Sequence, residues 1–217
     1  MKLFYTLVVL LFTVSTLAQN AGKNDPEAKK VLDGVSAKFK TYKTVKAAFT
    51  YKVENAAGKV LSTKAGSVIM KGQKYRVTIV GQEIFCDGIN VWTYDKAAKE
   101  VTITKFDGES TTLTPQKLFT NFYDQDFLYK LNGEKKQGNK TIQEIEMTPT
   151  DKTKPFHKVY VYVDKAAKTL SSTKVLEKAG SRYSYTVNTL TPNTTIADNQ
   201  FVFDAKKYPG VEIVDLR

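Results

Sequence analysis

Residues 159–163 read Val159-Tyr160-Val161-Tyr162-Val163, an apolar run in which small and aromatic side chains alternate. Alternation at period two is typical of a β-strand with different neighbours on its two faces. The same period recurs in Ala47–Val53, Tyr75–Ile79 and Val91–Tyr94. Similar short segments lie at 60–70, 101–106, 141–148, 170–176, 182–190 and 201–203. Most are separated by turn sequences that contain Gly or Asn, and two by the repeated loop sequence Asp-Lys-Ala-Ala-Lys at 95–99 and 164–168. The sequence therefore predicts a mainly β fold of about eleven short strands in hairpin order.

Helix signals are few. Asp25-Pro26-Glu27 combines an N-cap residue, a proline at the first turn and an early acid, which together favour a helix start. An apolar stripe follows at i, i+3 and i+7, formed by Leu32, Val35 and Phe39. A second helix is predicted from Thr114-Pro115 into Leu118-Phe119. We expect a strongly curved antiparallel sheet that forms an incomplete, half-open β-barrel, covered by a helical lid.

The first eighteen residues have the composition of a secretory signal peptide. Lys2 is followed by the apolar run Leu3–Phe12 and by small residues up to Ala18. The apolar run is shorter than the roughly 20 residues that span a bilayer, which favours cleavage after Ala18 over a membrane anchor. No cysteine follows that point as a site for a lipid anchor. No Pro/Ser-rich linker divides the remainder, so we expect residues 19–217 to form a single domain.

The composition of the 217-residue chain excludes several kinds of chemistry. Its single cysteine, Cys86, excludes an intramolecular disulfide and a Cys-based metal site, and its single histidine, His157, excludes a multi-histidine centre. The chain has neither a Gly-x-Ser-x-Gly elbow nor a phosphate-binding loop. Cys86 is expected to be a buried strand residue, and Asp124 and Asp126 to cap a short helix or face water. The sequence thus predicts no enzyme activity, no cofactor and no metal site.

The net charge of +11 raises the possibility of a nucleic-acid partner. Only three of the 33 basic residues are arginine, the residue best suited to bind phosphates and guanine edges. The lysines are spread over turns and strand edges, where they discourage pairing with other molecules. We therefore expect a lysine-rich surface and no nucleic-acid partner.

Several segments resemble, in order and spacing, the LolA-type outer-membrane lipoprotein carrier proteins. The most specific is Asp87–Tyr94, with the pattern Asp-Gly-x-x-x-Trp-x-Tyr. The others are Ala47–Val53, Gly66–Lys71, Met147–Pro149, Phe201–Phe203 and Pro209–Ile213. The resemblance extends over nearly all of the chain after residue 18.

This resemblance implies a monomeric periplasmic carrier with an apolar cavity under its lid. Such carriers accept acylated lipoproteins from an ATP-driven transporter of the inner membrane and deliver them to an acceptor at the outer membrane. The alternative is a sensor module of the same fold, which would bind lipid or a membrane-protein partner.

The expected ligand-binding residues lie on the lid and on the strands. The lid residues are Leu32, Val35, Phe39, Phe119, Phe122 and Phe127. By the resemblance, Tyr75 corresponds to an aromatic residue that lines the cavity, with Val77 and Ile79 on the same face, and Trp92 and Tyr94 belong to the Trp-x-Tyr strand. The alternative from periodicity alone is that these side chains simply fill the core. Gly72 stands where the best-known members have an arginine that helps hold the lid shut, so the lid must be held by other groups or weakly.

Overall fold

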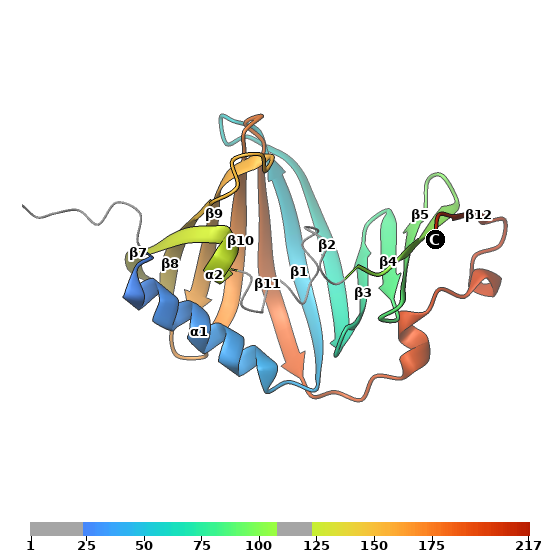
Figure 1. Cartoon of the computed structure of the whole chain (residues 1–217), viewed down its shortest axis with the longest axis horizontal. Coiled ribbons are helices and arrows are strands. Elements are labelled where there is room, and N and C mark those ends of the chain that lie inside the picture. The colour runs from blue at the N-terminus through green and yellow to red at the C-terminus, as the bar shows by residue number, and fades with distance from the viewer. Residues whose placement is uncertain (1–23, 108–122) are drawn as a thin grey trace, which may run out of the picture.

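The computed structural model describes residues 24–107 and 123–217, which form one curved twelve-stranded sheet with few helices (Figure 1). The strands are β1 (Thr44–Glu54), β2 (Val60–Lys71), β3 (Lys74–Ile79), β4 (Gln82–Cys86), β5 (Asn90–Asp95), β6 (Glu100–Lys105), β7 (Phe127–Gln137), β8 (Lys140–Pro149), β9 (Phe156–Asp164), β10 (Thr169–Glu177), β11 (Arg182–Pro192) and β12 (Glu212–Asp215). The helices are α1 (Pro26–Lys40), α2 (Tyr123–Asp126) and the 3₁₀ helices η2 (Asp198–Phe201) and η3 (Ala205–Lys207). The predicted mainly β class, with an incomplete barrel, is confirmed.

The order across the sheet is β12-β6-β5-β4-β3-β2-β1-β11-β10-β9-β8-β7. Most neighbours are joined by hairpins and are antiparallel, but β12 pairs in parallel with β6. At the centre, β1 pairs with both β2 and β11, which joins the start and the end of the meander. The two halves of the sheet are therefore held together by a pairing between strands far apart in the sequence.

Two features of the end of the chain differ from the sequence prediction. Residues 201–203 are not a strand, because Phe201 ends η2 and its fully buried ring packs onto the sheet. The last strand is instead β12, whose exposed residue Ile213 gave no alternating signal. Phe127, predicted as part of the lid, is the first residue of β7 and has only 6% of its surface exposed. The aromatic residues before Phe127 suggest a lid, whereas the segment that Phe127 begins is a strand that pairs with β8.

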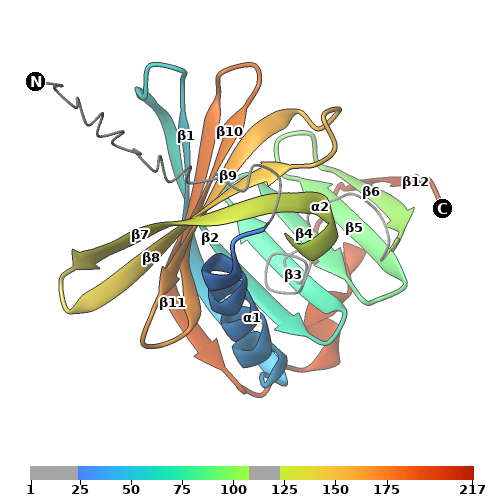
Figure 2. The ribbon, with the colours of Figure 1, turned by 60° about the vertical axis from the view of Figure 1, so that its left-hand side comes forward.

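Helix α1 lies across the inner, concave side of the sheet (Figure 2). Asp25 caps its first turn by accepting a hydrogen bond from the backbone N–H of Glu27 at 2.9 Å, as the sequence predicts. The same carboxylate accepts from the N–H of Leu131 in β7 at 2.9 Å. These bonds, the one from Leu131 first, hold the pKa of Asp25 below its ordinary value. The helix start is thereby fixed to an edge strand of the sheet.

Apolar side chains gather on both faces of the sheet. The concave core contains Leu32 and Val35 of α1 with Ile145, Met147 and Val161 of the sheet. A separate cluster lies on the opposite face of β4–β6 and is covered by the C-terminal segment; it contains Phe85, Tyr94, Val101, Ile103, Phe201, Phe203 and Tyr208. In Figure 1 this segment, in red, runs beside β3–β5 before it reaches β12. The C-terminal segment therefore covers the convex face of β4–β6.

The convex side of β1 carries a buried ionic group. Glu54, with 6% of its surface exposed, lies 2.8 Å from the Nζ of Lys52 and 2.7 Å from the Nζ of Lys174. Hydrogen bonds from Lys174 and then Lys52 outweigh burial and lower the pKa of Glu54 from 4.5 to about 2. Because the folded chain binds this proton less tightly than the unfolded chain, the stabilisation is complete above about pH 4.5. It is lost as the pH falls towards 2.

Replacing Glu54 by glutamine is expected to lower the free energy of unfolding at pH 7 by about 2 to 3 kcal/mol, because Lys52 and Lys174 then face each other without a counter-charge. The difference from the parent protein should shrink as the pH is lowered from 4.5 to 2, measured by urea unfolding. Glu134→Gln, at the exposed pair with Lys165, is the control and should have a much smaller effect. An equal loss in both variants would contradict a special contribution from the buried group.

Candidate functional site

Four aromatic side chains lie together on the concave face at the centre of the sheet. They are Phe49 and Tyr51 of β1 and Tyr183 and Tyr185 of β11, here called the concave aromatic patch. The ring centres of Tyr51 and Tyr185 are 4.9 Å apart, and Tyr51 and Tyr183 stack with centres 6.0 Å apart and planes within 3°. Phe49 and Tyr185 are 6.2 Å apart. Together the rings form one continuous aromatic surface.

The strand register explains why these rings share the concave face. Directly paired residues of neighbouring strands lie on the same face of a sheet. Tyr185 is paired with Tyr51 on one side and with Thr173 on the other, and Thr173 is paired with Val161 of the concave core. An irregularity in the β1–β11 pairing between Ala48 and Phe49 lets both ends of β11 keep apolar residues on this face.

The patch is apolar in character yet open to solvent. Tyr185 has 39% of its surface exposed, and the other three rings are half-buried. Burial raises the pKa of Tyr51 to about 12, with a further contribution from Tyr185, and burial also raises the pKa of Tyr185. The hydroxyl groups of both residues are therefore uncharged at neutral pH. Such a surface suits a flexible apolar ligand that covers the rings.

Gly66 of β2 makes room for the ring of Phe49. The two residues are cross-strand partners, and the ring lies so close over Gly66 that a methyl group there would overlap it. A glycine under an aromatic ring in a neighbouring strand allows the ring to lie flat on the sheet. The absence of a side chain at Gly66 therefore determines how closely the Phe49 ring can lie to β2.

Gly66→Ala is expected to push the Phe49 ring off β2, lowering the free energy of unfolding by about 1 to 2 kcal/mol. It should also expose Phe49, which near-ultraviolet circular dichroism or an NMR contact between the ring and β2 would detect. Gly34→Ala in α1 is the matched control, because its added methyl group meets only the Lys168 side chain at an ordinary 3.7 Å. That change should stabilise the helix by about 0.5 to 1 kcal/mol. An unmoved Phe49 ring in Gly66→Ala would contradict the packing described.

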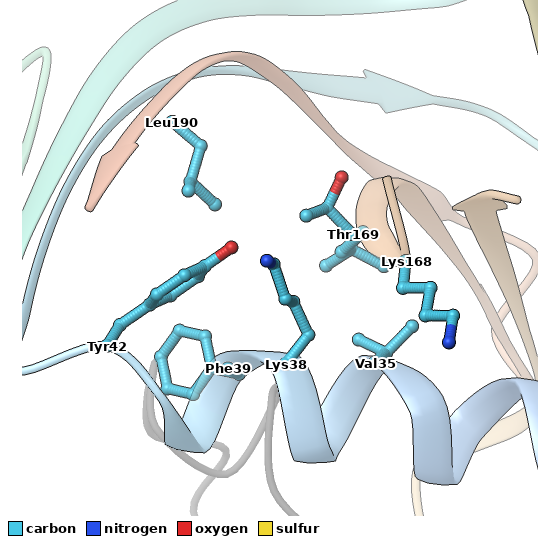
Figure 3. Close-up of a pocket in the computed structure, with 8 residues that line it drawn as sticks. Val35, Lys38, Phe39, Tyr42, Lys168, Thr169 and Leu190 are labelled. Carbon is cyan, nitrogen blue, oxygen red and sulfur yellow. The ribbon is translucent and has the colours of Figure 1, made fainter. Parts of the chain in front are cut away.

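A small pocket lies under the C-terminal end of α1 (Figure 3). Its enclosed space is small, with room for about one water molecule. Val35, Phe39, Leu170 and Leu190 supply apolar lining, while Lys38, Tyr42, Lys168 and Thr169 complete the wall. Figure 3 shows the Lys168 side chain directed away from the pocket, whereas the Lys38 side chain and the Tyr42 hydroxyl point into it. The pocket is therefore a small gap beside the helix with both apolar and polar walls.

The family model of the outer membrane lipoprotein carrier protein LolA matches residues 40–204, from the end of α1 to the segment after η2. This chain belongs to the LolA family. The matched range contains the whole concave aromatic patch. No curated protein sequence matches the chain.

Several solved structures are similar to this LolA-family chain at low sequence identity. An uncharacterized conserved protein from Thermus thermophilus has a TM-score of 0.58 at 14% identity, covering 87% of this chain and 99% of its own. A LolA superfamily protein from Nitrosomonas europaea has a TM-score of 0.42 at 11% identity, with 81% and 97% covered. The Mycobacterium tuberculosis lipoprotein LppX has a TM-score of 0.49 at 9% identity, with 80% and 100% covered.

The structure brings seven of the predicted binding residues to the concave side, of which Phe127 is described below. Leu32 and Val35 are buried in the core, while Phe39 is half-buried and lines the pocket. Tyr75, Val77 and Ile79 of β3 lie on the concave face. Tyr75 is the cross-strand partner of Met70 in β2, and Val77 is the partner of Val68. Tyr75 has only 6% of its surface exposed. These side chains fill the core of this LolA-family chain, and an open apolar surface lies instead at the concave aromatic patch.

Trp92 and Tyr94 do not lie with Tyr75. Trp92 is paired with Phe85, and Tyr94 with Val101, on the face covered by the C-terminal segment. Tyr94 packs against Tyr208 with ring centres 4.6 Å apart. The odd-numbered residues of β3 and the even-numbered residues of β5 point to opposite faces, which the register alone decides. The expectation that one cavity gathers all these residues is wrong for this pair.

The remaining predicted residues belong to the segment before β7. Phe119 and Phe122, and the helix predicted from Thr114, lie outside the described residues. Phe127 stacks on Phe156 of β9, with ring centres 6.2 Å apart, and belongs to the concave core. The four residues of the concave aromatic patch were missed as site residues, although the alternation of Phe49 and Tyr51, and of Tyr183 and Tyr185, is a visible signal.

A polar network holds the N-terminal half of helix α1, which covers the concave face of this LolA-family chain. Lys29 binds Asp33 at 3.1 Å and Asp124 of α2 at 3.2 Å. The hydroxyl of Tyr123 donates to Asp33 at 2.8 Å, and that of Tyr129 donates to Asp124 at 3.0 Å. Hydrogen bonds to Asp33 and then Asp124 raise the pKa of Lys29. The network ties α1 to α2 and β7, far from Gly72.

Gly72 itself lies in the hairpin turn between β2 and β3. Its φ of +58° is in the left-handed region that favours glycine. An arginine here would be strained in this turn. Glycine at this position, where the best-known members have arginine, therefore fits the left-handed backbone of the turn. The polar network holds the N-terminal half of α1 instead.

The single cysteine and the single histidine lie in different surroundings. Cys86 is fully buried in β4, as predicted, and burial raises the pKa of its thiol. His157 is exposed on β9.

No helix among the described residues is long and apolar enough to cross a membrane. Within residues 24–107 and 123–217, no group of three or more His, Cys, Asp or Glu side chains is placed to hold a metal ion.

Proposed function

We propose that this protein is a periplasmic, non-enzymatic carrier that shelters the acyl chains of lipoproteins on its concave face. The concave aromatic patch is the observation that carries the proposal, because it is a partly open apolar surface inside a curved sheet. Membership of the LolA family supports it. The carrier would take its cargo from an ATP-driven inner-membrane transporter and pass it to an outer-membrane acceptor.

The energetics of acyl transfer fit a surface of this kind. Moving a chain out of water is worth about 0.8 kcal/mol per CH₂, so one long chain is worth on the order of 10 kcal/mol. A cargo with that exposure cannot cross an aqueous compartment without cover. Aromatic faces provide large apolar area, and the neutral hydroxyls of Tyr51 and Tyr185 add no charge. A partly open surface also permits release at the destination, which a sealed core would prevent.

The concave core beneath α1 is filled by side chains, so the cargo would first contact the open patch. The pocket at the end of α1 adjoins the same face, but it has room for only about one water molecule and would have to widen before it could accept part of a chain. Deeper entry would require α1 to move, and its polar network with α2 and β7 is the restraint on that movement.

Release of a lipoprotein from vesicles tests the proposal. The chain would be mixed with inner-membrane vesicles that hold both the ATP-driven transporter and a fluorescent triacylated lipoprotein, ATP would be added, and the vesicles would then be sedimented. We expect the lipoprotein to appear in the supernatant as a one-to-one complex, and a non-acylated version of the same protein to show no complex. Lipoprotein that remains entirely with the vesicles at excess carrier would overturn the proposal.

A further inference from the structure

The sheet splits between β2 and β3. Strand β2 has twelve residues, but β3 pairs only with its second half, Gly66–Lys71. The first half, Val60–Ala65, pairs with β1 on one side and has no strand partner on its other side among the described residues. Figure 1 shows this part of β2 extending past the end of β3. Within residues 24–107 and 123–217, an unpaired strand edge therefore lies in the middle of a twelve-stranded sheet.

That edge presents backbone donors and acceptors that an extended peptide can pair with in place of water. Alternate residues of a strand direct their N–H and C=O groups to each side, so six residues offer about three donors and three acceptors outward. An exposed edge is a template for another extended segment. An acyl chain has no donors or acceptors and leaves these groups unchanged. The chemistry of the edge thus calls for a polypeptide.

The edge adjoins the concave aromatic patch. Lys64 is the cross-strand partner of Tyr51, and Gly66 is the partner of Phe49. A segment added along Val60–Ala65 would therefore lie one strand away from Phe49 and Tyr51, with only β2 between them. A ligand with an acyl group at the end of an extended peptide would satisfy both surfaces at once.

The charges favour one occupant. Lys59 and Lys64 are exposed, and neither has an acidic partner within the part of the chain that the structure describes. The lysines would repel the same edge of a second copy and attract a segment that contains Asp or Glu. Val60 and Leu61, with 49% and 61% of their surfaces exposed, add apolar contact at the start of the strand.

We propose that the free edge of β2 binds, by β-strand addition, an acid-containing extended segment that directly follows the acylated N-terminus of the cargo. This inference rests on the proposed function, because the acyl chains bring the segment to the edge. Recognition would then have two parts, apolar contact at the patch and main-chain hydrogen bonds at β2. Affinity would depend on the peptide as well as on the lipid.

Hydrogen exchange with two synthetic probes tests the inference. One probe is a triacylated cysteine amide, and the other is the same group followed by an eight-residue linker of Ser, Asp and Gly. We expect the second probe to slow the exchange of outward amides in Val60–Ala65 by at least about tenfold, and the first to leave them unchanged. We also expect the second probe to bind about tenfold more tightly.

Matched variants and probes separate the possible results. N-methylation of alternate linker amides, in each of the two registers, should return the affinity to that of the lipid probe in one register. Lys59→Glu, just before β2, should weaken the linker probe alone, whereas Lys46→Glu, on the convex side of β1, should weaken neither.

Two results would overturn the inference and leave the proposed function standing. One is tight binding of both probes with unchanged exchange along β2. The other is protection of β2 that grows with protein concentration in the absence of any probe, which would assign the edge to a second copy. Failure of both probes to bind would overturn the proposed function together with the inference.

Discussion

Tyr185→Glu is expected to weaken binding of an acylated lipoprotein on the order of 100-fold while the sheet remains folded. Tyr185 is the most exposed ring of the concave aromatic patch and contacts both Phe49 and Tyr51. A carboxylate in its place would have to lose water when an acyl chain covers it, and no basic side chain is paired opposite it in β1 or β10. Binding would be measured by fluorescence titration with the acylated lipoprotein.

Thr186→Glu provides the control. It introduces the same charge one residue further along β11, where the side chain points to the convex face. Both positions are exposed, so each change should alter the free energy of unfolding by about 1 kcal/mol at most. Equal affinity of the two variants for the lipoprotein would contradict the placement of the binding surface on the concave face.

Tyr75→Glu is expected to lower the free energy of unfolding by about 4 kcal/mol or more, so that the loss of function follows from loss of the fold. Tyr75 is buried against Cys86 and Met70, and burial raises the pKa of its hydroxyl to about 12. A glutamate there would leave a carboxyl group in apolar surroundings without partners. Urea unfolding followed by circular dichroism measures the loss.

Tyr75→Phe is the matched comparison, since it keeps the ring and removes only the hydroxyl. We expect a change within about 1 kcal/mol and unchanged lipoprotein binding. A stable, folded Tyr75→Glu variant with impaired binding would show instead that this residue lines an accessible cavity, as the resemblance implied. The pair of variants therefore distinguishes a core residue from a ligand contact.

The fold was largely predictable because its signals are local. Period-two alternation marks β1, β3, β5 and β9 residue by residue, and the Asp25-Pro26-Glu27 sequence marks the start of α1. The exceptions have physical reasons. The aromatic start of β7 is interpreted from the sequence as part of a lid, although it is a strand. The apolar residue Phe201 is interpreted as part of a strand, although it ends a 3₁₀ helix and is buried against the sheet.

The site was less predictable because a β-strand has two faces. The alternation at Trp92 and Tyr94 is as clear as that at Tyr75 and Val77, but no local signal says which face of the sheet each set shares. The C-terminal segment covers one set and α1 covers the other. Only the register of β3, β4 and β5 decides between them.

The sequence by itself determined the mainly β class, the helix in front of the sheet, the buried cysteine and the membership of a lipoprotein-carrier family. These depend on residue type and short-range order. The tertiary structure decided that Phe49 and Tyr51 meet Tyr183 and Tyr185, more than 130 residues along the chain. It also decided that, among the described residues, half of β2 has a strand partner on one side only. The reason is that strand pairing is non-local: which strands become neighbours, and where one ends before the other, depends on packing across the whole sheet.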